Sequence, residues 1–379
     1  MIICAPDSFK ESMTAAAAAR AMARGVRHAW PDADVALVPM ADGGEGTCAA
    51  LQAALGGHRR AVDCHDALGR PIRAEYLHVP DRRLACVEMA AAAGIELLTA
   101  DERNPRVTST FGVGELIRAA LDEDVDELLI GLGGSATNDA GAGMLRALGA
   151  RWVDERGAEL SSGGAALADL AEVDLSGLDE RLRTVRIVLA SDVTNPLLGP
   201  RGASHVFGPQ KGADPGVVAE LDRVLARWAD VVEHATGVAV RDQPGAGAAG
   251  GLGAAFMACT GASTRSGAEY VMEAAGIDEL LRDADLVLTG EGSWDAQSAA
   301  GKAPAALAAR AAAAGVPTVV FAGRVDAPPE QPLPDGVVAV VPVVQGVCTL
   351  DEALADGERN LERAVATALR LLRQGLAAG

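Results

Sequence analysis

Aromatic residues are scarce in this chain, and their scarcity limits how its core is built. Only 3% of the 379 residues are aromatic, whereas 49% are hydrophobic, so the core must consist of alanine, valine and leucine. Single cores seldom grow beyond roughly 250–300 residues. We therefore expect two domains.

Lysine is also scarce. Only three of the 33 basic residues are lysine, and all three lie in loop-like segments: Lys10, Lys211 and Lys302. Where a chain uses arginine almost everywhere, the remaining lysines are candidates for positions that need a compact ammonium group rather than a planar guanidinium. Surface loops often carry lysine, so chance is the alternative explanation.

Several residue patterns of catalytic or metal-binding proteins are missing. The six cysteines include no CxxC pair, and the six histidines include no HxxxH pair, which argues against a zinc site and a disulfide framework. No G-x-S-x-G segment is present, and His205 is the only histidine in a candidate loop. Catalysis by a serine or cysteine nucleophile is therefore disfavoured.

Positive charge and long apolar runs are missing too. The formal net charge of -19 argues against nucleic acid and an acidic membrane surface as partners. No apolar run reaches the roughly 18 residues of a membrane-spanning helix, and the N-terminal segment does not resemble a signal peptide. We therefore expect a cytoplasmic protein, as a monomer or homodimer, without nucleic acid or membrane partners.

The chain is organised around residues 131–149, GLGGSATNDAGAGMLRALG. The segment follows an apolar run at 127–132, which predicts a buried strand, and it ends in a predicted helix with a glycine cap. A glycine-rich turn between strand and helix typically binds phosphate, because backbone amides at the helix start face the anion. A mere tight turn would not need four small polar residues, and here they are Ser135, Thr137, Asn138 and Asp139.

The two ends of the chain differ in pattern from its middle. Residues 2–40 predict a strand, an alanine-rich helix capped by Thr14, and a second strand, and residues 286–374 again alternate strands with helices, which indicates a parallel sheet. Between residues 60 and 89 apolar and polar residues nearly alternate, which predicts hairpins. The predicted fold class is α/β. Residues 1–60 and 282–379 form a Rossmann-like domain, residues 61–281 form an inserted mixed α/β domain, and the site lies in the cleft between them.

Acidic residues follow the ends of predicted strands, where ligands of open parallel sheets bind. Five of them lie in small, glycine-rich loops: Asp42, Asp139, Asp192, Glu291 and Asp295. Each alone is more simply a helix cap or a solvated loop residue. Together with the lysines they match phosphate chemistry, which uses amides and ammonium groups for phosphates, carboxylates for Mg²⁺, and a base. Phosphoryl transfer and metal-assisted hydrolysis of a phosphate ester both fit.

Residues 245–250, GAGAAG, match the dinucleotide-binding pattern G-x-G-x-x-G. That pattern requires a buried strand before it, whereas residues 241–244 are polar and end in proline. An NAD-dependent oxidoreductase is therefore disfavoured, and close approach to a nucleotide or to a neighbouring helix remains open.

Near the end of the chain, a short strand is predicted at 286–289 and a loop at 290–295.

Seven motifs in one order resemble the bacterial glycerate kinase family and cover essentially the whole chain. They are APDSFKESMTA (5–15), ADGGEGT (41–47), GGSATNDAGAG (133–143), DVTNPLLGPRGAS (192–204), FGPQKGA (207–213), PGAGAAGGLGAA (244–255) and TGEGSWDAQSAAGK (289–302). Trp294 departs from the family pattern, which usually has a smaller aliphatic residue there. The resemblance implies phosphorylation of D-glycerate by ATP with Mg²⁺ on a two-domain α/β fold.

Within this resemblance the candidate residues take predicted roles. The catalytic residues are Asp192, as the base for the substrate hydroxyl, with Lys10 and Lys302. The residues predicted to contact D-glycerate are Ser8, Asn195 and Lys211. The residues predicted to bind ATP and its phosphates are Gly133, Gly134, Ser135, Asn138, Gly245 and Gly247. The candidates for Mg²⁺ are Asp42, Asp139, Glu291 and Asp295.

The expected product is 2-phosphoglycerate, with 3-phosphoglycerate as the alternative. A kinase of a related hydroxy acid also fits the resemblance. A non-catalytic sensor of a sugar acid or nucleotide on the same scaffold is the alternative from another functional class. Binding alone would not require the full set of carboxylates and lysines, which favours the enzyme.

Overall fold

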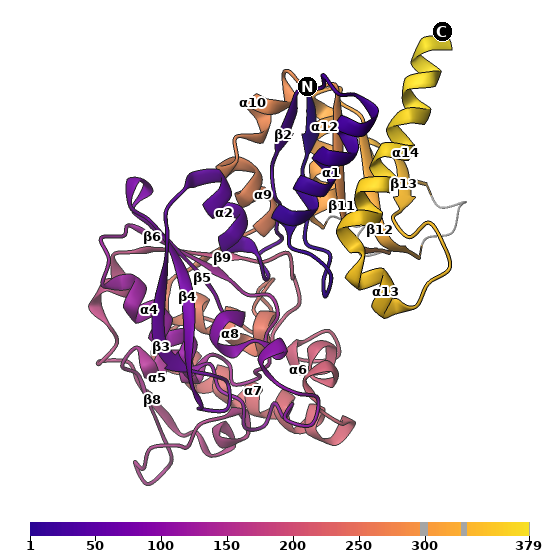
Figure 1. Cartoon of the computed structure of the whole chain (residues 1–379). Helices are drawn as coiled ribbons and strands as arrows, with labels where there is room; N and C mark the ends of the chain where they lie inside the picture. The colour runs from indigo at the N-terminus through magenta and orange to yellow at the C-terminus, as the bar shows by residue number, and fades with distance from the viewer. Residues whose placement is uncertain (296–301, 327–331, 379) are drawn as a thin grey trace. The chain divides into compact units, whose positions relative to one another are not determined.

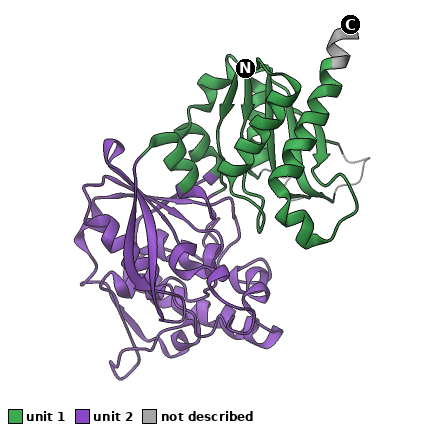
Figure 2. Ribbon diagram, viewed as in Figure 1, with its two compact units in different colours: residues 1–42, 49–56, 268–379 green, residues 43–48, 57–267 purple. Residues whose placement is uncertain are grey.

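The computed structural model describes residues 1–295, 302–326 and 332–378 (Figure 1). The chain forms two compact units, which Figure 2 shows in different colours. Unit 1 comprises residues 1–42, 49–56 and 268–379, and unit 2 comprises residues 43–48 and 57–267. Both ends of the chain therefore belong to unit 1. The domain limits expected from the sequence stay a prediction.

Unit 1 is built on a five-stranded sheet in which all neighbouring strands are parallel, in the order β13-β12-β11-β1-β2. The strands are β1 (Ile2–Cys4), β2 (Val35–Leu37), β11 (Leu286–Trp294), β12 (Thr318–Val325) and β13 (Val337–Pro342). The helices are α1 (Ala15–Ala29), α2 (Thr47–Leu55), α9 (Gly267–Ala274), α10 (Ile277–Leu281), α12 (Ala303–Ala313), α13 (Leu350–Ala355) and α14 (Gly357–Ala378). Helix α2 begins in unit 2 and continues in unit 1.

Helix α1 shows how the sequence forms these elements. The Thr14 side chain accepts a hydrogen bond from the Ala17 N–H at 3.2 Å, which confirms the cap predicted by a threonine before an alanine-rich run. Met22 and Val26, four residues apart on one helix face, are fully buried with Val365 of α14 and the sheet. Helices α1 and α14 therefore lie side by side on the sheet (Figure 1).

Strand β11 is longer than the sequence predicted, so the loop expected at 290–295 was wrong. Gly290 and Glu291 continue the strand and pair with Phe321 and Ala322 of β12. Glycines usually mark loops, but in a strand they also allow close approach of another backbone. A Cβ atom on Gly290 would lie only 2.2 Å from the Phe321 carbonyl oxygen.

Unit 2 contains a six-stranded mixed sheet in the order β10-β9-β6-β5-β4-β3. The parallel strands are β5 (Leu84–Glu88), β6 (Glu127–Gly131), β9 (Arg186–Ala190) and β10 (Ser263–Arg265). The antiparallel hairpin strands are β3 (His58–His65) and β4 (Pro71–Val79), and β4 is also antiparallel to β5. The predicted hairpins and the predicted α/β class are confirmed. Strands β7 (Arg151–Val153) and β8 (Glu172–Asp174) form a separate antiparallel pair.

The helices of unit 2 enclose a core that is mostly aliphatic. They are α3 (Ala90–Ala93), α4 (Phe111–Leu121), α5 (Ala142–Ala147), α6 (Ala203–Phe207), α7 (Pro215–Thr236) and α8 (Leu252–Thr260). The short 3₁₀ helices are Pro80–Arg82, Ile95–Leu97, Gly164–Asp169, Glu180–Arg183, Pro209–Lys211 and Ala248–Gly251. Trp152 and Trp228 are fully buried, with ring centroids 6.4 Å apart, so two of the few aromatic residues meet in this core.

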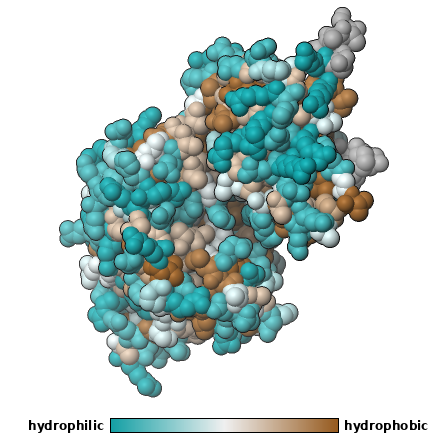
Figure 3. Space-filling model, in the orientation of Figure 1, coloured by the Kyte–Doolittle hydropathy of each residue, from teal (hydrophilic) through white to brown (hydrophobic). Residues whose placement is uncertain are grey.

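The surface agrees with the strongly acidic composition. The face shown in Figure 3 is dominated by hydrophilic residues, with hydrophobic ones in small groups. Among the described residues, no helix is both long and apolar enough to cross a membrane.

Candidate active site

The parallel strands of unit 2 end in one row. Glu88 at the end of β5 pairs with Gly131 of β6, Gly131 pairs with Ala190 of β9, and Ala190 pairs with Arg265 of β10. The glycine-rich loop leaves the sheet after Gly131. Asp192, which is exposed, follows β9 by two residues. The carboxyl edge of this sheet therefore carries two of the loops that the sequence nominated.

Part of the ADGGEGT motif lies on this edge. The Gly43 carbonyl accepts a hydrogen bond from the Gly133 N–H at 3.2 Å. A Cβ atom on Gly43 would lie 2.4 Å from the Ala190 carbonyl oxygen, and one on Gly133 would lie 2.5 Å from the Cα atom of Gly44. These glycines are therefore required for two backbones to cross in contact.

The polar residues of the glycine-rich loop point inward. Ser135 is 8% exposed and Thr137 is fully buried. Lys211 is 1% exposed, and its Nζ donates to Ser135 Oγ and to the Thr137 carbonyl oxygen, at 2.7 Å each. Burial lowers the pKa of Lys211 to about 7, although the Asp139 charge opposes the shift. Lys211, predicted to contact substrate, therefore supports the loop from inside.

Asn138 and Asp139 have internal partners as well. The Asn138 side-chain amide donates to Ser204 Oγ at 3.0 Å. The Asp139 carboxylate accepts from the N–H and hydroxyl of Thr110, at 2.8 and 2.9 Å, and from the N–H groups of Gly141 and Gly143, at 3.2 Å each. Burial raises the pKa of Asp139, whereas these hydrogen bonds lower it. Asp139 thus organises the start of α5, and its role as a metal ligand stays a prediction.

The tip of the loop is open. Gly134 is exposed with a φ of +75°, and Gly133 is half-buried. A positive φ is readily adopted by glycine and rarely by other residues. The backbone at Gly133 and Gly134 is therefore the more exposed part of this loop, whereas the Ser135 hydroxyl is buried and already bonded to Lys211.

The GAGAAG segment packs on two other loops. The Gly247 N–H donates to the Asn195 carbonyl oxygen at 3.0 Å, and the Gly250 carbonyl accepts from the Ala140 N–H at 3.1 Å. A Cβ atom on Gly250 would lie 2.0 Å from the Thr137 carbonyl oxygen. Gly247 and Gly250 thus allow this segment to pack closely against the neighbouring loops, whereas Gly245 has more open surroundings. The Asn195 side chain donates to the Arg201 carbonyl oxygen at 2.7 Å.

Unit 1 brings carboxylates together at the carboxyl ends of its own strands. Asp7 follows β1, Asp42 follows β2, and Glu291 lies in β11. Burial raises the pKa of Asp7 to about 7, and the negative charges of Asp42 and Glu291 add to the shift. The Ser8 N–H, 2.6 Å from Asp7 Oδ1, and the charge of Lys10 oppose it. The charges of Asp42 and Glu291 thus act on the Asp7 carboxyl group.

The donor set at this edge suits Mg²⁺, which binds one or two carboxylates together with substrate phosphates and water. Within the part of the chain that the structure describes, no three His, Cys, Asp or Glu side chains lie close enough together to hold a metal ion by themselves. Asp295 is half-buried just after β11, and Lys302 lies at the start of α12. Residues 296–301 of the last motif lie outside the described residues. Trp294 is buried against Ala305 and Ala308.

Sequence reasoning missed two carboxylates at these edges. Asp7 lies in the APDSFKES motif directly after a strand, and this position was a usable signal. Glu88 ends the buried run Leu84–Val87 and is half-buried beside Gly131. Its only signal was a charged residue at the end of an apolar strand. The hairpin pattern of that region concealed that β5 continues into the parallel part of the sheet.

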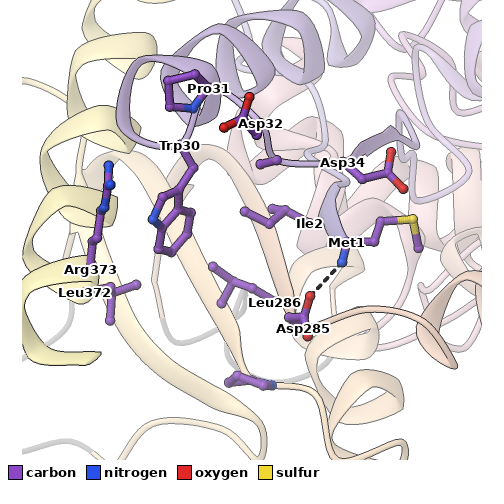
Figure 4. Close-up of a pocket in the computed structure, with 12 residues that line it drawn as sticks. Met1, Ile2, Trp30, Pro31, Asp32, Asp34, Asp285, Leu286, Leu372 and Arg373 are labelled. Atoms are coloured by element: carbon purple, nitrogen blue, oxygen red, sulfur yellow. Dashed lines mark hydrogen bonds and ion pairs between the residues drawn. The ribbon is translucent and has the colours of Figure 1, made fainter. Parts of the chain in front are cut away.

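A separate cavity of about 590 Å³ opens at the amino ends of the strands of unit 1 (Figure 4). Trp30, Ile2, Leu286 and Leu372 contribute its apolar walls. None of the predicted site residues lines it. Because ligands of parallel sheets bind at the carboxyl ends of the strands, this cavity is not the candidate active site.

Comparison with known proteins decides the family. The model of the glycerate kinase family matches residues 2–373. The chain belongs to the glycerate kinase family. It is 46% identical to a glycerate kinase of Bacillus subtilis (strain 168), over 96% of this chain and 95% of that protein. It is also 46% identical to a glycerate 2-kinase of Escherichia coli (strain K12), with the same coverage.

A solved structure supports the fold of this family member. A crystal structure assigned as a glycerate kinase 2 from Salmonella typhimurium LT2 matches with a TM-score of 0.86 and 44% identity, over 99% of both chains. The predicted family, the α/β class and the prediction of a kinase are confirmed. A kinase of this family uses a nucleotide as one substrate and a small molecule as the other.

Proposed function

We propose that this glycerate kinase family member transfers the γ-phosphoryl group of ATP to D-glycerate and forms 2-phosphoglycerate. The observation that carries the proposal is the match, over 95–96% of both chains, to curated glycerate kinases. The name of the Escherichia coli relative, glycerate 2-kinase, supports carbon 2 as the site of phosphorylation.

We assign the ATP phosphates to the open tip of the glycine-rich loop of unit 2, at Gly133 and Gly134. Backbone amides in such a turn bind anions without a charged side chain, and Gly134, whose backbone is exposed, supplies the amide here, because the Gly133 N–H is already bonded to the Gly43 carbonyl oxygen. Ser135 and Asn138 contribute by holding the loop, because both side chains are buried and bonded to Lys211 and Ser204. Lys302 is assigned to phosphate charge, because it lies at the start of α12, where the helix dipole also favours anions.

We assign the glycerate carboxylate, or the phosphoryl group in transfer, to Lys10 and Ser8. Lys10 is exposed at the carboxyl end of β1, where an ammonium group remains available to an anionic ligand. Asp192 is assigned as the base that accepts the proton of the glycerate hydroxyl, because it is exposed two residues after β9. Asn195 contributes to the same loop through its bond to the Arg201 carbonyl.

Mg²⁺ is assigned to the carboxylate edge of unit 1, with Asp7, Asp42, Glu291 and Asp295 as the candidate ligands. The ion neutralises phosphate charge when it is bound with the nucleotide. The surroundings of Asp7 support this assignment. A carboxyl group whose pKa is raised by burial and by neighbouring negative charge gains most from a cation.

Phosphorus NMR of the purified chain with Mg-ATP and D-glycerate tests the proposal. A phosphomonoester signal should grow together with ADP, and its coupling to the glycerate protons should identify carbon 2. Coupling to the carbon 3 protons would move the transfer to the other hydroxyl. Intact ATP in the presence of folded protein would contradict the proposed activity.

A further inference from the structure

Glu88 lies where the glycine-rich loop leaves the sheet of unit 2. It ends β5 in register with Gly131, the last residue of β6. A Cβ atom on Gly131 would lie 3.7 Å from Glu88 Cγ and 2.8 Å from the Gly43 carbonyl oxygen. The Glu88 side chain and the Gly43 backbone are therefore immediate neighbours of the start of the loop.

The Glu88 carboxylate holds the end of the segment Gly43–Cys48. Its Oε1 accepts a hydrogen bond from the Cys48 N–H at 2.7 Å, at the beginning of α2. The first N–H groups of a helix have no intrahelical partner and carry partial positive charge, so a carboxylate is a strong acceptor there. Cys48 Sγ also donates to the Cys86 carbonyl oxygen at 3.2 Å. Two residues of β5 thus hold the same end of the segment.

The other end of Gly43–Cys48 holds the glycine-rich loop. The Gly43 carbonyl accepts the Gly133 N–H, and the Thr47 hydroxyl donates to the Gly44 carbonyl at 2.7 Å. The segment is therefore braced internally between Cys48, which Glu88 holds, and Gly43, which contacts the loop. A helix cap alone would explain the bond to Cys48, but not this continuation to Gly133.

We propose that Glu88 is a positioning residue, which keeps the Gly133–Gly134 backbone in its phosphate-binding arrangement by anchoring Gly43–Cys48. Glu88 itself does not touch the substrate in this scheme. The kinetic part of the proposal rests on the function proposed above, because it assigns ATP phosphates to the Gly133–Gly134 tip. What Glu88 supplies is a hydrogen-bond acceptor, and its negative charge is secondary.

The kinetic test compares Glu88→Ala and Glu88→Gln in the full chain. Alanine removes the acceptor and leaves the N–H of the buried residue Cys48 unsatisfied, so the KM for ATP should rise about tenfold to a hundredfold. Glutamine keeps a carbonyl oxygen for the Cys48 N–H, so its KM should stay within about threefold of the wild-type value. The KM for glycerate should change little in either variant. Glu75→Ala, an exposed glutamate of β4 in the same sheet, is the matched control.

Two kinetic results would overturn the proposal. If Glu88→Gln were as impaired as Glu88→Ala, the charge rather than the acceptor would be required. If Glu88→Ala bound ATP like the wild type, the anchor would have no role in the loop. Should the alanine variant fail to fold, Glu88→Asp, which withdraws the carboxylate by one methylene, takes its place with the same expected rise in KM.

Hydrogen exchange tests the anchor independently of catalysis. In Glu88→Ala, amide exchange should accelerate at residues 43–48 and at 132–136, and it should remain near the wild-type rate in Glu88→Gln and Glu75→Ala. Acceleration at 43–48 alone would reduce Glu88 to a helix cap and overturn the proposal. Because this measurement needs no substrate, failure of the proposed kinase activity and failure of the anchor are distinguishable.

Discussion

The buried ammonium group of Lys211 offers a sharp test of the loop structure. Burial lowers its pKa from 10.5 to about 7. In the unfolded chain the group is protonated up to its ordinary pKa, so between pH 7 and pH 10.5 the unfolded state binds more protons than the folded state. Stability therefore rises with pH in this window, by up to about 1.4 kcal/mol per pH unit. The cost of burying the charge is fully present below pH 7 and is relieved as the pH approaches 10.5.

The size of this effect follows from the burial. Lys211 is 1% exposed, and its two acceptors, Ser135 Oγ and the Thr137 carbonyl, are neutral groups. Across the whole window the linkage amounts to at most about 5 kcal/mol, which is comparable to the stability of a typical domain. An ammonium group in this place is therefore costly at neutral pH.

The scarcity of lysine makes the measurement simple. Labelling lysine with ¹³C at Cε gives signals from only three side chains. One of them should titrate near pH 7, and that signal should be absent from Lys211→Met, whose side chain is unbranched, apolar and of similar length. Lys10→Met, which removes an exposed lysine, is the control for assignment. If the signal lost in Lys211→Met titrates near the ordinary lysine value, the reasoning from burial is refuted.

Further predictions concern catalysis and packing. Lys10→Ala and Asp192→Asn should each lower kcat at least about a hundredfold in a coupled ADP assay, and a near-wild-type rate would remove that residue from the mechanism. Retained activity in Lys10→Arg would contradict the argument from lysine scarcity, because arginine carries a planar guanidinium group instead of a compact ammonium group. Gly250→Ala should lower the melting temperature more than Gly237→Ala. Both glycines have positive φ, but only at Gly250 would the new Cβ meet a backbone atom, the Thr137 carbonyl oxygen at 2.0 Å.

Local pattern was sufficient where a local cause forms the element. Thr14 predicted the cap of α1, because a threonine before an alanine-rich run satisfies an open N–H of the first turn. Near alternation of apolar and polar residues predicted the hairpin of β3 and β4, because successive side chains of a strand point to opposite faces of the sheet. The same local reading was wrong at Gly290, where the glycine allows contact with a neighbouring strand.

By itself the sequence determined the α/β class, the family and the loops in which to look for chemistry, since strand and helix periods and long motifs are properties of contiguous residues. Only the tertiary structure decided which of the candidate side chains are buried and bonded inside the protein. Ser135 and Asn138 turn inward because Lys211 and Ser204, about 70 residues away in the chain, supply their hydrogen-bond partners. Glu88 became a candidate only because β5 lies beside β6 and places its last residue next to Gly131. Such pairings depend on how strands are ordered in the sheet, and no local pattern encodes that order.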